Sequence, residues 1–242
     1  MNERPHEPVI VSRRFRGPTS SGNGGYVCGL VAARVPFPVT VRLLKPPPLE
    51  IGLDVVEAGE RIELRLGDAV IAEARPGDVG DLSPPAPPTL DEAAAAASHY
   101  AGFAKHFAPE CFVCGPRRAP GDGLRLFAGA LGEPSAAVAA PWTPDASLDA
   151  GDGRVALEFM WAALDCPGYL AVAGDMRAML LGELTARVLR RVDVGEACVV
   201  VGWPIRSSGR KHETGTAVFG AQKDLCALGR GLWIEPRATS GA

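Results

Sequence analysis

Long hydrophobic stretches are missing from this sequence. No run approaches the roughly 18 consecutive apolar residues of a membrane-spanning helix. The segment from Met1 to Pro8 also lacks the basic-then-apolar order of a secretory signal peptide. We therefore expect a cytoplasmic protein without a membrane partner.

An excess of positive charge is missing too. The 242 residues carry 25 Lys and Arg against 28 Asp and Glu, a formal net charge of -3. Proteins that bind nucleic acid through its phosphates usually have a basic surplus, because each neutralised phosphate releases counterions. We expect no nucleic-acid partner.

Several common catalytic and nucleotide-binding motifs are absent. The glycine-rich segment from Gly22 to Gly25 lacks the Gly-Lys-Ser/Thr of a phosphate loop, and no Gly-x-Gly-x-x-Gly follows an expected strand. The Gly-x-Ser-x-Gly motif of serine hydrolases is missing as well. These absences disfavour nucleotide-dependent chemistry and a serine nucleophile.

The cysteines do not form a complete metal-binding pattern. Cys111-x-x-Cys114 has no second Cys-x-x-Cys and no His-x3-5-His partner. With His99 and His106 the pair could supply four ligands, but most of the cysteines lie in apolar runs, where a reduced Cys packs as a small hydrophobe. We expect six free thiols and no metal; they are Cys28, Cys111, Cys114, Cys166, Cys198 and Cys226.

A segment rich in proline and alanine divides the chain. Prolines are concentrated over residues 76–88, and the Ala-rich stretch that follows Thr89 reads as a helix with Thr89 as its N-cap. Apolar residues make up 47% of the chain, enough for one or two hydrophobic cores. We expect one folded unit at residues 1–75, a linker with a helix at 76–110, and a second unit at 111–242.

The two units show the same order of elements: a short strand, an apolar helix and several strands with period-two alternation. In the first unit we expect strands at 9–15, 39–44, 49–58, 60–66 and 69–73, and a helix at 24–35. In the second we expect strands at 124–127, 136–139, 182–192, 197–206, 212–219 and 226–234, and a long helix at 157–173.

An internal repeat supports a duplication. The segment Thr40 to Lys45 aligns with Thr185 to Arg190 at an offset of 145 residues (185 − 40), and Gly67 to Ala72 resembles Lys223 to Leu228. The matches occur in the same order in both halves. The sequence therefore predicts an α+β fold made of two helix-plus-antiparallel-sheet units.

Several segments resemble hotdog-fold acyl-CoA thioesterase-like proteins. Cys111 to Pro116, followed by Gly121 to Leu126, is similar to the CFxCGP...GLxLxF opening of that family. Trp161 to Asp165 resembles the central helix of the branch that contains phenylacetyl-CoA and 4-hydroxybenzoyl-CoA thioesterases. Ser21 to Tyr26 resembles the Asn/His-Gly-Gly start of the same helix. Two further segments, 208–211 and 223–227, resemble the closing hairpin.

This resemblance implies a double hotdog, in which two helix-wrapped antiparallel sheets are fused in one chain. Hotdog thioesterases build each site from helix N-terminal amides of one unit and a carboxylate of the other. Here Glu158-Phe159 stands where the second helix would have Gly-Gly, and the acid position of the first helix falls near Val31. We therefore expect one competent site and one degenerate site.

The resemblance assigns catalytic roles to Asn23, Gly24, Gly25 and Asp165. The helix-start amides at Gly24 and Gly25 would stabilise an oxyanion, and Asp165 would act as general base or as nucleophile. Asn23 would cap the helix or bind substrate. A structural alternative for Asp165 is that it satisfies backbone groups freed by a helix break near Pro167.

Six further residues are candidates for substrate binding. Tyr26 and Trp161 would shape the acyl tunnel, and a basic cluster would hold the phosphates of coenzyme A. That cluster could equally be a solvated turn. Its members are Arg206, Arg210, Lys211 and His212.

The function implied is hydrolysis of an acyl thioester, carried by coenzyme A or an acyl-carrier protein, with no cofactor apart from the coenzyme A of the substrate. One alternative is a non-catalytic acyl-CoA or acyl-carrier-protein binder, since one site is lost. Another is a hotdog dehydratase, which needs an Asp-His pair at its site. A homodimer of double hotdogs is also open.

Overall fold

One antiparallel sheet of eleven strands runs through residues 7–237, which the computed structural model describes. Its order is β1-β3-β4-β5-β2-β8-β11-β10-β9-β7-β6. The strands are β1 (Val9–Ile10), β2 (Val39–Leu43), β3 (Gly52–Ala58), β4 (Arg61–Leu66), β5 (Ala69–Pro76), β6 (Gly129–Ala130), β7 (Val138–Trp142), β8 (Leu180–Val188), β9 (Cys198–Ser208), β10 (Lys211–Phe219) and β11 (Leu225–Ile234). The first five belong to the first half of the chain.

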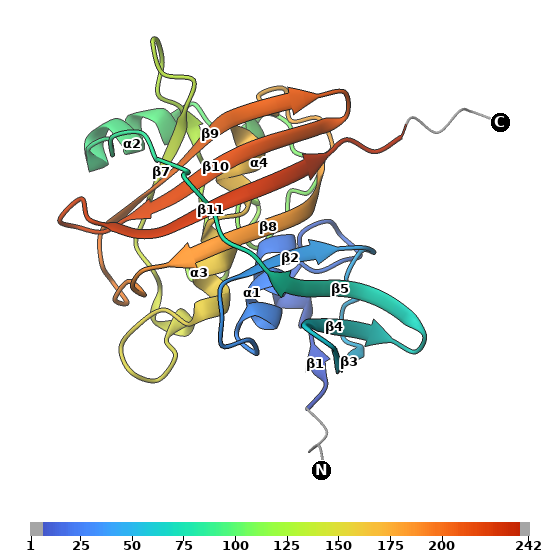
Figure 1. Ribbon diagram of the computed structural model, residues 1–242. Helices are drawn as coiled ribbons and strands as arrows, with labels where there is room; N and C mark the ends of the chain where they lie inside the picture. The colour runs from blue at the N-terminus through green and yellow to red at the C-terminus, as the bar shows by residue number, and fades with distance from the viewer. Residues whose placement is uncertain (1–6, 238–242) are drawn as a thin grey trace.

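In the described residues, three α-helices cover one face of the sheet, and the linker helix packs against the opposite face. Figure 1 shows α1, α3 and α4 together behind the strands, with α2 at one end of the sheet. The helices are α1 (Gly24–Ala32), α2 (Leu90–Ser98), α3 (Leu157–Ala163) and α4 (Cys166–Leu170), and short 3-10 turns span Arg13–Phe15, Ala101–Phe103 and Ala146–Leu148. No helix of the described residues is long and apolar enough to cross a membrane.

The two halves of the sheet join where β2 pairs with β8. Thr40 lies opposite Thr185, with their hydroxyl oxygens 2.8 Å apart, and Val41 lies opposite Leu184. Thr40 and Thr185 are also the aligned residues of the internal repeat, so each half meets its own counterpart at the seam. This is the relation that two subunits have about a two-fold axis.

Helices α1 and α3 pack closely and antiparallel across the same pseudo-two-fold axis. A Cβ atom added to Gly25 would lie 3.1 Å from the Cα of Ala162, and one added to Gly29 would lie 2.5 Å from the Cα of Glu158. The two contacts are related by symmetry, because Glu158 follows Gly25 by 133 residues and Ala162 follows Gly29 by the same number (158 − 25 and 162 − 29). The helices can approach this closely only because both positions are glycine.

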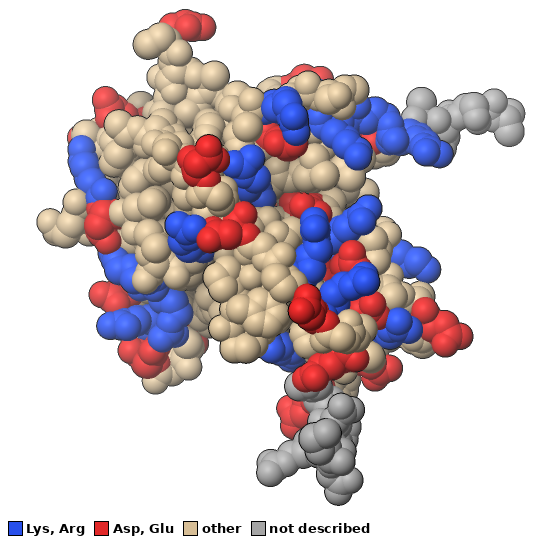
Figure 2. Space-filling view, viewed as in Figure 1, with Lys and Arg blue, Asp and Glu red and all other residues tan. Residues whose placement is uncertain are grey.

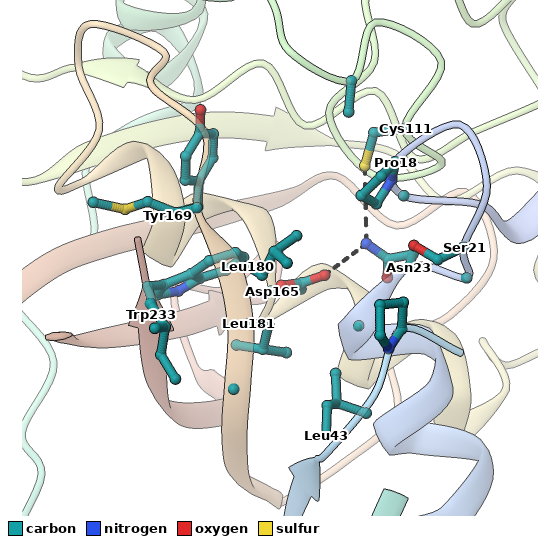
Figure 3. A pocket seen from close by; sticks show the side chains of 18 of the residues that line it. Pro18, Ser21, Asn23, Leu43, Cys111, Asp165, Tyr169, Leu180, Leu181 and Trp233 are labelled. Carbon is teal, nitrogen blue, oxygen red and sulfur yellow. Dashed lines mark hydrogen bonds between the residues drawn. The ribbon is translucent and has the colours of Figure 1, made fainter. Parts of the chain in front are cut away.

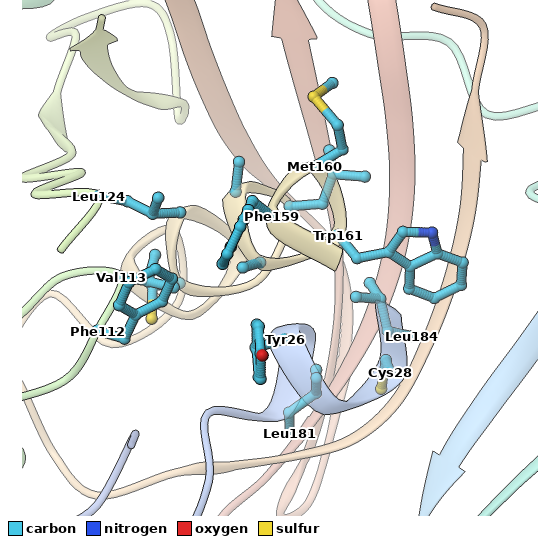
Figure 4. Packing of buried hydrophobic residues seen from close by; sticks show 14 of the residues in the cluster. Tyr26, Cys28, Phe112, Val113, Leu124, Phe159, Met160, Trp161, Leu181 and Leu184 are labelled. Carbon is cyan, nitrogen blue, oxygen red and sulfur yellow. The ribbon is translucent and has the colours of Figure 1, made fainter. Parts of the chain in front are cut away.

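A shared core fills the space between helices and sheet. Tyr26 stacks on Phe15 and Phe159, and Phe112 contacts all three rings (Figure 4). These rings come from both halves and from the segment after the linker, and they belong to one continuous cluster of buried side chains.

The linker helix α2 forms with the cap that its sequence predicts. The hydroxyl of Thr89 accepts a hydrogen bond from the Glu92 N–H, and the Glu92 carboxylate accepts one from the Thr89 N–H, which completes a capping box. Ala93 packs with apolar residues of β7 and β9. The linker is thus anchored on the sheet of the second half.

The expected helix at 157–173 is wrong in its length. It ends as α3 at Ala163, and α4 begins only at Cys166. Pro167 explains the break, because proline lacks an N–H and its ring clashes with the carbonyl four residues earlier, here that of Ala163. Asp165 lies between the two helices with ψ −87°.

Two expected strands also differ. The strand at 9–15 is shortened to β1, and the 3-10 turn Arg13–Phe15 follows it. The strand at 124–127 does not form, because Leu124 and Leu126 donate their N–H groups to the carbonyls of Phe112 and Val113 instead. These residues therefore pack against the Cys111-x-x-Cys114 turn, and the edge of the sheet is the short β6.

Charge is mixed over the face in Figure 2, where Lys and Arg alternate with Asp and Glu. Ion pairs are numerous in the described residues; Arg190, for instance, donates to both oxygens of Glu196 and to Asp224. The basic side chains on this face are thus interspersed with acidic ones.

Gly29→Ala tests the close packing of α1 against α3. The added methyl group overlaps Glu158, so the free energy of unfolding should fall by about 1–3 kcal/mol in chemical denaturation. Gly174→Ala is the matched control, because its new Cβ meets nothing within 4 Å, and a change within about 0.5 kcal/mol is expected. Equal effects of the two substitutions would contradict this packing.

Candidate active site

One cavity of about 400 Å³ opens where the two halves meet. Its walls come from the loop before α1, the loop after β2, the segment before the Cys111 turn, α4, the start of β8 and the end of β11 (Figure 3). The lining combines apolar side chains with a few polar groups from α1 and from the break between α3 and α4, as binding sites for small molecules usually do.

Asn23 organises the start of α1. Its side-chain oxygen accepts the Tyr26 N–H at 2.9 Å, which makes it the N-cap. Its amide nitrogen donates to Asp165 Oδ2 at 2.6 Å, and Figure 3 shows the same nitrogen facing Cys111, whose sulfur is 3.8 Å away. Asn23 therefore caps one helix and binds the carboxylate from the other half at once.

Asp165 is a buried carboxyl group held at one oxygen. Its Oδ2 accepts both Asn23 Nδ2–H and the Gly25 N–H, the latter at 3.0 Å, whereas Oδ1 has no hydrogen-bond partner among the described residues. Burial raises the pKa of Asp165 to about 7, while the Gly25 and Asn23 hydrogen bonds act in the opposite direction. The free oxygen belongs to a residue that lines the cavity.

Gly24 offers a further donor at the helix start. As the first residue of α1 its N–H has no partner within the helix, and no acceptor for it is found in residues 7–237. Gly24 lines the cavity beside Asp165. A free N–H at a helix N-terminus is suited to bind a partial negative charge.

The second, pseudosymmetric site lacks these groups. The offset of 133 residues places Ala156 where Asn23 stands and Ala32 where Asp165 stands. Ala156 is the N-cap of α3 and makes no side-chain cap bond. Among the described residues, the pair of an N-cap side chain and a buried carboxylate is therefore present at one of the two related positions.

Three thiols lie beside the carboxylate. Cys111 and Cys166 have their sulfurs 3.7 Å apart, and the Cys114 sulfur lies 3.4 Å from His106 Nε2. All six cysteines are free and buried. His99 lies at the end of α2, where its Nδ1 contacts Ser98, so it does not join this group.

A second cluster of ligand atoms consists of Glu196, Asp224 and Cys226. Both carboxylates pair with Arg190. The hydrogen bonds from Arg190 lower the pKa of Glu196 to about 2 and also lower the pKa of Asp224. This cluster is an ion-pair network in which both carboxylates bind the one guanidinium of Arg190.

The structure brings together all four residues expected to be catalytic. Asn23, Gly24 and Asp165 line the cavity, and Gly25 contacts Asp165 through its N–H. A Cβ atom on Gly25 would lie 2.5 Å from the Asp165 Cβ, so this position needs glycine.

The residues expected to bind substrate are mostly elsewhere. Tyr26 and Trp161 are buried in the core and do not line the cavity. Arg206 pairs with Glu213 on the exposed hairpin, and Lys211 is exposed outside the cavity.

Two members of the basic cluster lie close to the cavity wall. Arg210 lines the cavity and donates to the Glu235 carbonyl. His212 is buried behind it, between Ser207 and the Glu235 carboxylate. Charged side chains near the opening are therefore Arg210 and Glu235, together with Lys45 from the loop after β2.

Sequence reasoning missed Lys45 and Cys166 as lining residues. Lys45 stands just before a proline run that forms the cavity wall, and no motif marks it. Cys166 does carry a signal, because it directly follows Asp165, the acid of the expected site.

Neither a protein-family model nor a curated protein sequence matches this chain. Solved structures do match it. The tesB protein of Mycobacterium avium subspecies paratuberculosis is 16% identical, covers 90% of this chain and 89% of its own, and has a TM-score of 0.59. A proposed thioesterase from Novosphingobium aromaticivorans is 12% identical, with 98% and 97% coverage and a TM-score of 0.61.

A third similar structure, a proposed thioesterase II from Thermobifida fusca, is 17% identical, with 90% and 88% coverage and a TM-score of 0.54. These likenesses extend over nearly the whole chain and confirm the double hotdog. The chain therefore shares the double-hotdog fold of these solved structures.

Substitutions of Asn23 separate its two bonds. Asn23→Ala removes the helix cap and one donor to Asp165, so the free energy of unfolding should fall by about 1–3 kcal/mol. Asn23→Ser keeps an acceptor for the Tyr26 N–H and should recover about 1 kcal/mol of that loss. Urea denaturation measures both. Identical stabilities for the two variants would show that the cap contributes nothing.

Proposed function

We propose that this protein hydrolyses an acyl thioester carried by coenzyme A or an acyl-carrier protein. The observation that carries the proposal is the meeting, at one cavity, of the Asp165 carboxylate from the second half with the free start of α1 from the first. Thioester hydrolysis requires these two components, a proton acceptor for water and a donor for the developing oxyanion.

The chemistry follows from the positions of the groups. The thioester carbonyl oxygen accepts the Gly24 N–H, and a water molecule binds at the unpartnered Oδ1 of Asp165. As the water oxygen bonds to the carbonyl carbon, its proton passes to Asp165. The oxyanion then collapses, the carbon–sulfur bond breaks, and the leaving thiolate takes the proton back from Asp165.

The other groups orient this reaction. Asn23 and the Gly25 N–H hold Oδ2 and so turn Oδ1 toward the water. The apolar wall that includes Leu181 and Trp233 receives the acyl group. Lys45 and Arg210 are exposed cations on the lining, placed to bind the phosphates of coenzyme A.

Asp165→Asn tests the proton acceptor. The amide keeps an oxygen for the Gly25 N–H but cannot take a proton, so kcat for thiol release from acyl-CoA esters should fall by at least about 100-fold. The variant should still bind the same esters, as measured by the increase in its melting temperature on adding them. Asp68→Asn in the exposed turn between β4 and β5 is the matched control and should leave kcat unchanged.

The outcomes separate hydrolysis from binding alone. Thermal shifts without thiol release by the parent protein would support the non-catalytic acyl-CoA or carrier-protein binder. Undiminished release by Asp165→Asn would remove Asp165 from the mechanism.

Arg210→Ala tests the phosphate contact. Loss of one cation at the cavity should raise KM for acyl-CoA by about 3- to 10-fold and leave kcat nearly constant. The same change at its neighbour Lys211, which lies outside the cavity, should alter KM less than about twofold. A larger effect at Lys211 would place the coenzyme on the exposed hairpin instead.

A further inference from the structure

Three cysteine sulfurs form a compact group on the wall of the cavity. The Sγ atoms of Cys111, Cys114 and Cys166 all lie within 4.8 Å of one another, and all three residues are buried. Cys111 and Cys114 come from the turn after the linker, and Cys166 begins α4. Chain segments far apart in sequence thus converge on one point.

The spacing of the sulfurs suits a tetrahedral metal ion. Zinc–sulfur bonds of about 2.3 Å at tetrahedral angles place neighbouring sulfurs about 3.8 Å apart. The Cys111 and Cys166 sulfurs are 3.7 Å apart. A disulfide would need about 2.05 Å, so this pair has the spacing of two metal ligands, and the third sulfur lies within 4.8 Å of both.

The Cys111-x-x-Cys114-Gly115 turn is built tightly around this point. The Gly115 N–H donates to the Cys111 carbonyl at 2.9 Å, and a Cβ atom on Gly115 would lie 2.5 Å from the Cys111 backbone. Two cysteines separated by two residues in such a turn are a common half of a zinc site.

Side chains around the group also donate toward sulfur. The Ala108 backbone N–H donates to His106 Nδ1 at 2.9 Å, so the ring proton must be on Nε2, which points at the Cys114 sulfur. Asn23 Nδ2 faces the Cys111 sulfur. His106 therefore supports a thiolate and is not itself a ligand, because a ligating histidine would need the opposite tautomer.

We propose that Cys111, Cys114 and Cys166 bind one Zn²⁺ ion whose fourth coordination position faces the cavity. Within residues 7–237, no His, Cys, Asp or Glu supplies a fourth ligand atom that lies within 4.8 Å of all three sulfurs. Three protein ligands and one open position are the usual arrangement of an accessible zinc site. Thiolates select zinc over magnesium or calcium.

Binding converts three thiols into three thiolates and releases three protons, so the loaded group carries one negative charge. The N–H donors of His106 and Asn23 stabilise that charge. This assignment does not depend on the proposed hydrolysis, because it concerns metal affinity alone.

Cobalt titration of the reduced full-length protein tests the site. We expect one Co²⁺ per chain, with a thiolate-to-cobalt charge-transfer band and the visible bands of a tetrahedral ion, all displaced by Zn²⁺. Cys111→Ala and Cys166→Ala should each weaken Co²⁺ binding on the order of 100-fold or more, and His106→Gln about 10-fold. Cys198→Ala, a buried cysteine of β9 outside the group, should change neither stoichiometry nor spectrum.

A second measurement does not require the variants to fold. Zn²⁺ should protect Cys111, Cys114 and Cys166 of the unchanged protein from alkylation, as mapped by mass spectrometry, and leave the reactivity of Cys198 unaltered. Absence of a thiolate band in the reduced protein would overturn the proposal. So would protection of other cysteines, or oxidation of Cys111 and Cys166 to a disulfide in a chain that takes up no metal.

Discussion

The structure depends on the contact between the Asp165 carboxylate and the start of α1. Asn23 and the Gly25 N–H both bind one oxygen of a side chain that is only 2% exposed. Hydrogen bonds to a charged group contribute about 1.5–3 kcal/mol, so this contact links the two halves. It forms only because glycine at position 25 lets α1 and α3 approach. The same bonds engage only Oδ2, so Asp165, a cavity-lining residue, keeps Oδ1 without a hydrogen-bond partner among the described residues.

The fused chain explains why the two related positions can differ. In a homodimer every substitution appears at both sites, whereas each half of a fused pair changes independently. Here Asn23 and Asp165 occupy one position, and Ala156 and Ala32 occupy the other. The seam keeps its symmetry at Thr40 and Thr185, because sheet pairing constrains both halves equally. The strand pairing at the seam has therefore remained duplicated, while the polar groups of the site have not.

Much of the fold and part of the site could be predicted from local patterns. The Thr89 cap, the period-two strands and the start of α1 at Gly24 form as expected. The pairing of α1 with Asp165 could also be anticipated, because each half lacks what the other supplies. The length of the second central helix could not, because proline at position 167 ends α3 four residues upstream. That break frees Asp165 from helical geometry.

The sequence by itself determined the duplicated α+β plan, because turns, caps and hydrophobic period act over a few neighbouring residues. Only the tertiary structure decided which side chains face the cavity. Tyr26 is stacked in the core, although its neighbours in sequence line the site. Cys166 meets Cys111 across 55 residues of chain, a contact made by the packing of α4 against the turn after the linker. No local pattern encodes that approach, since it depends on where the sheet and the helix break place both segments.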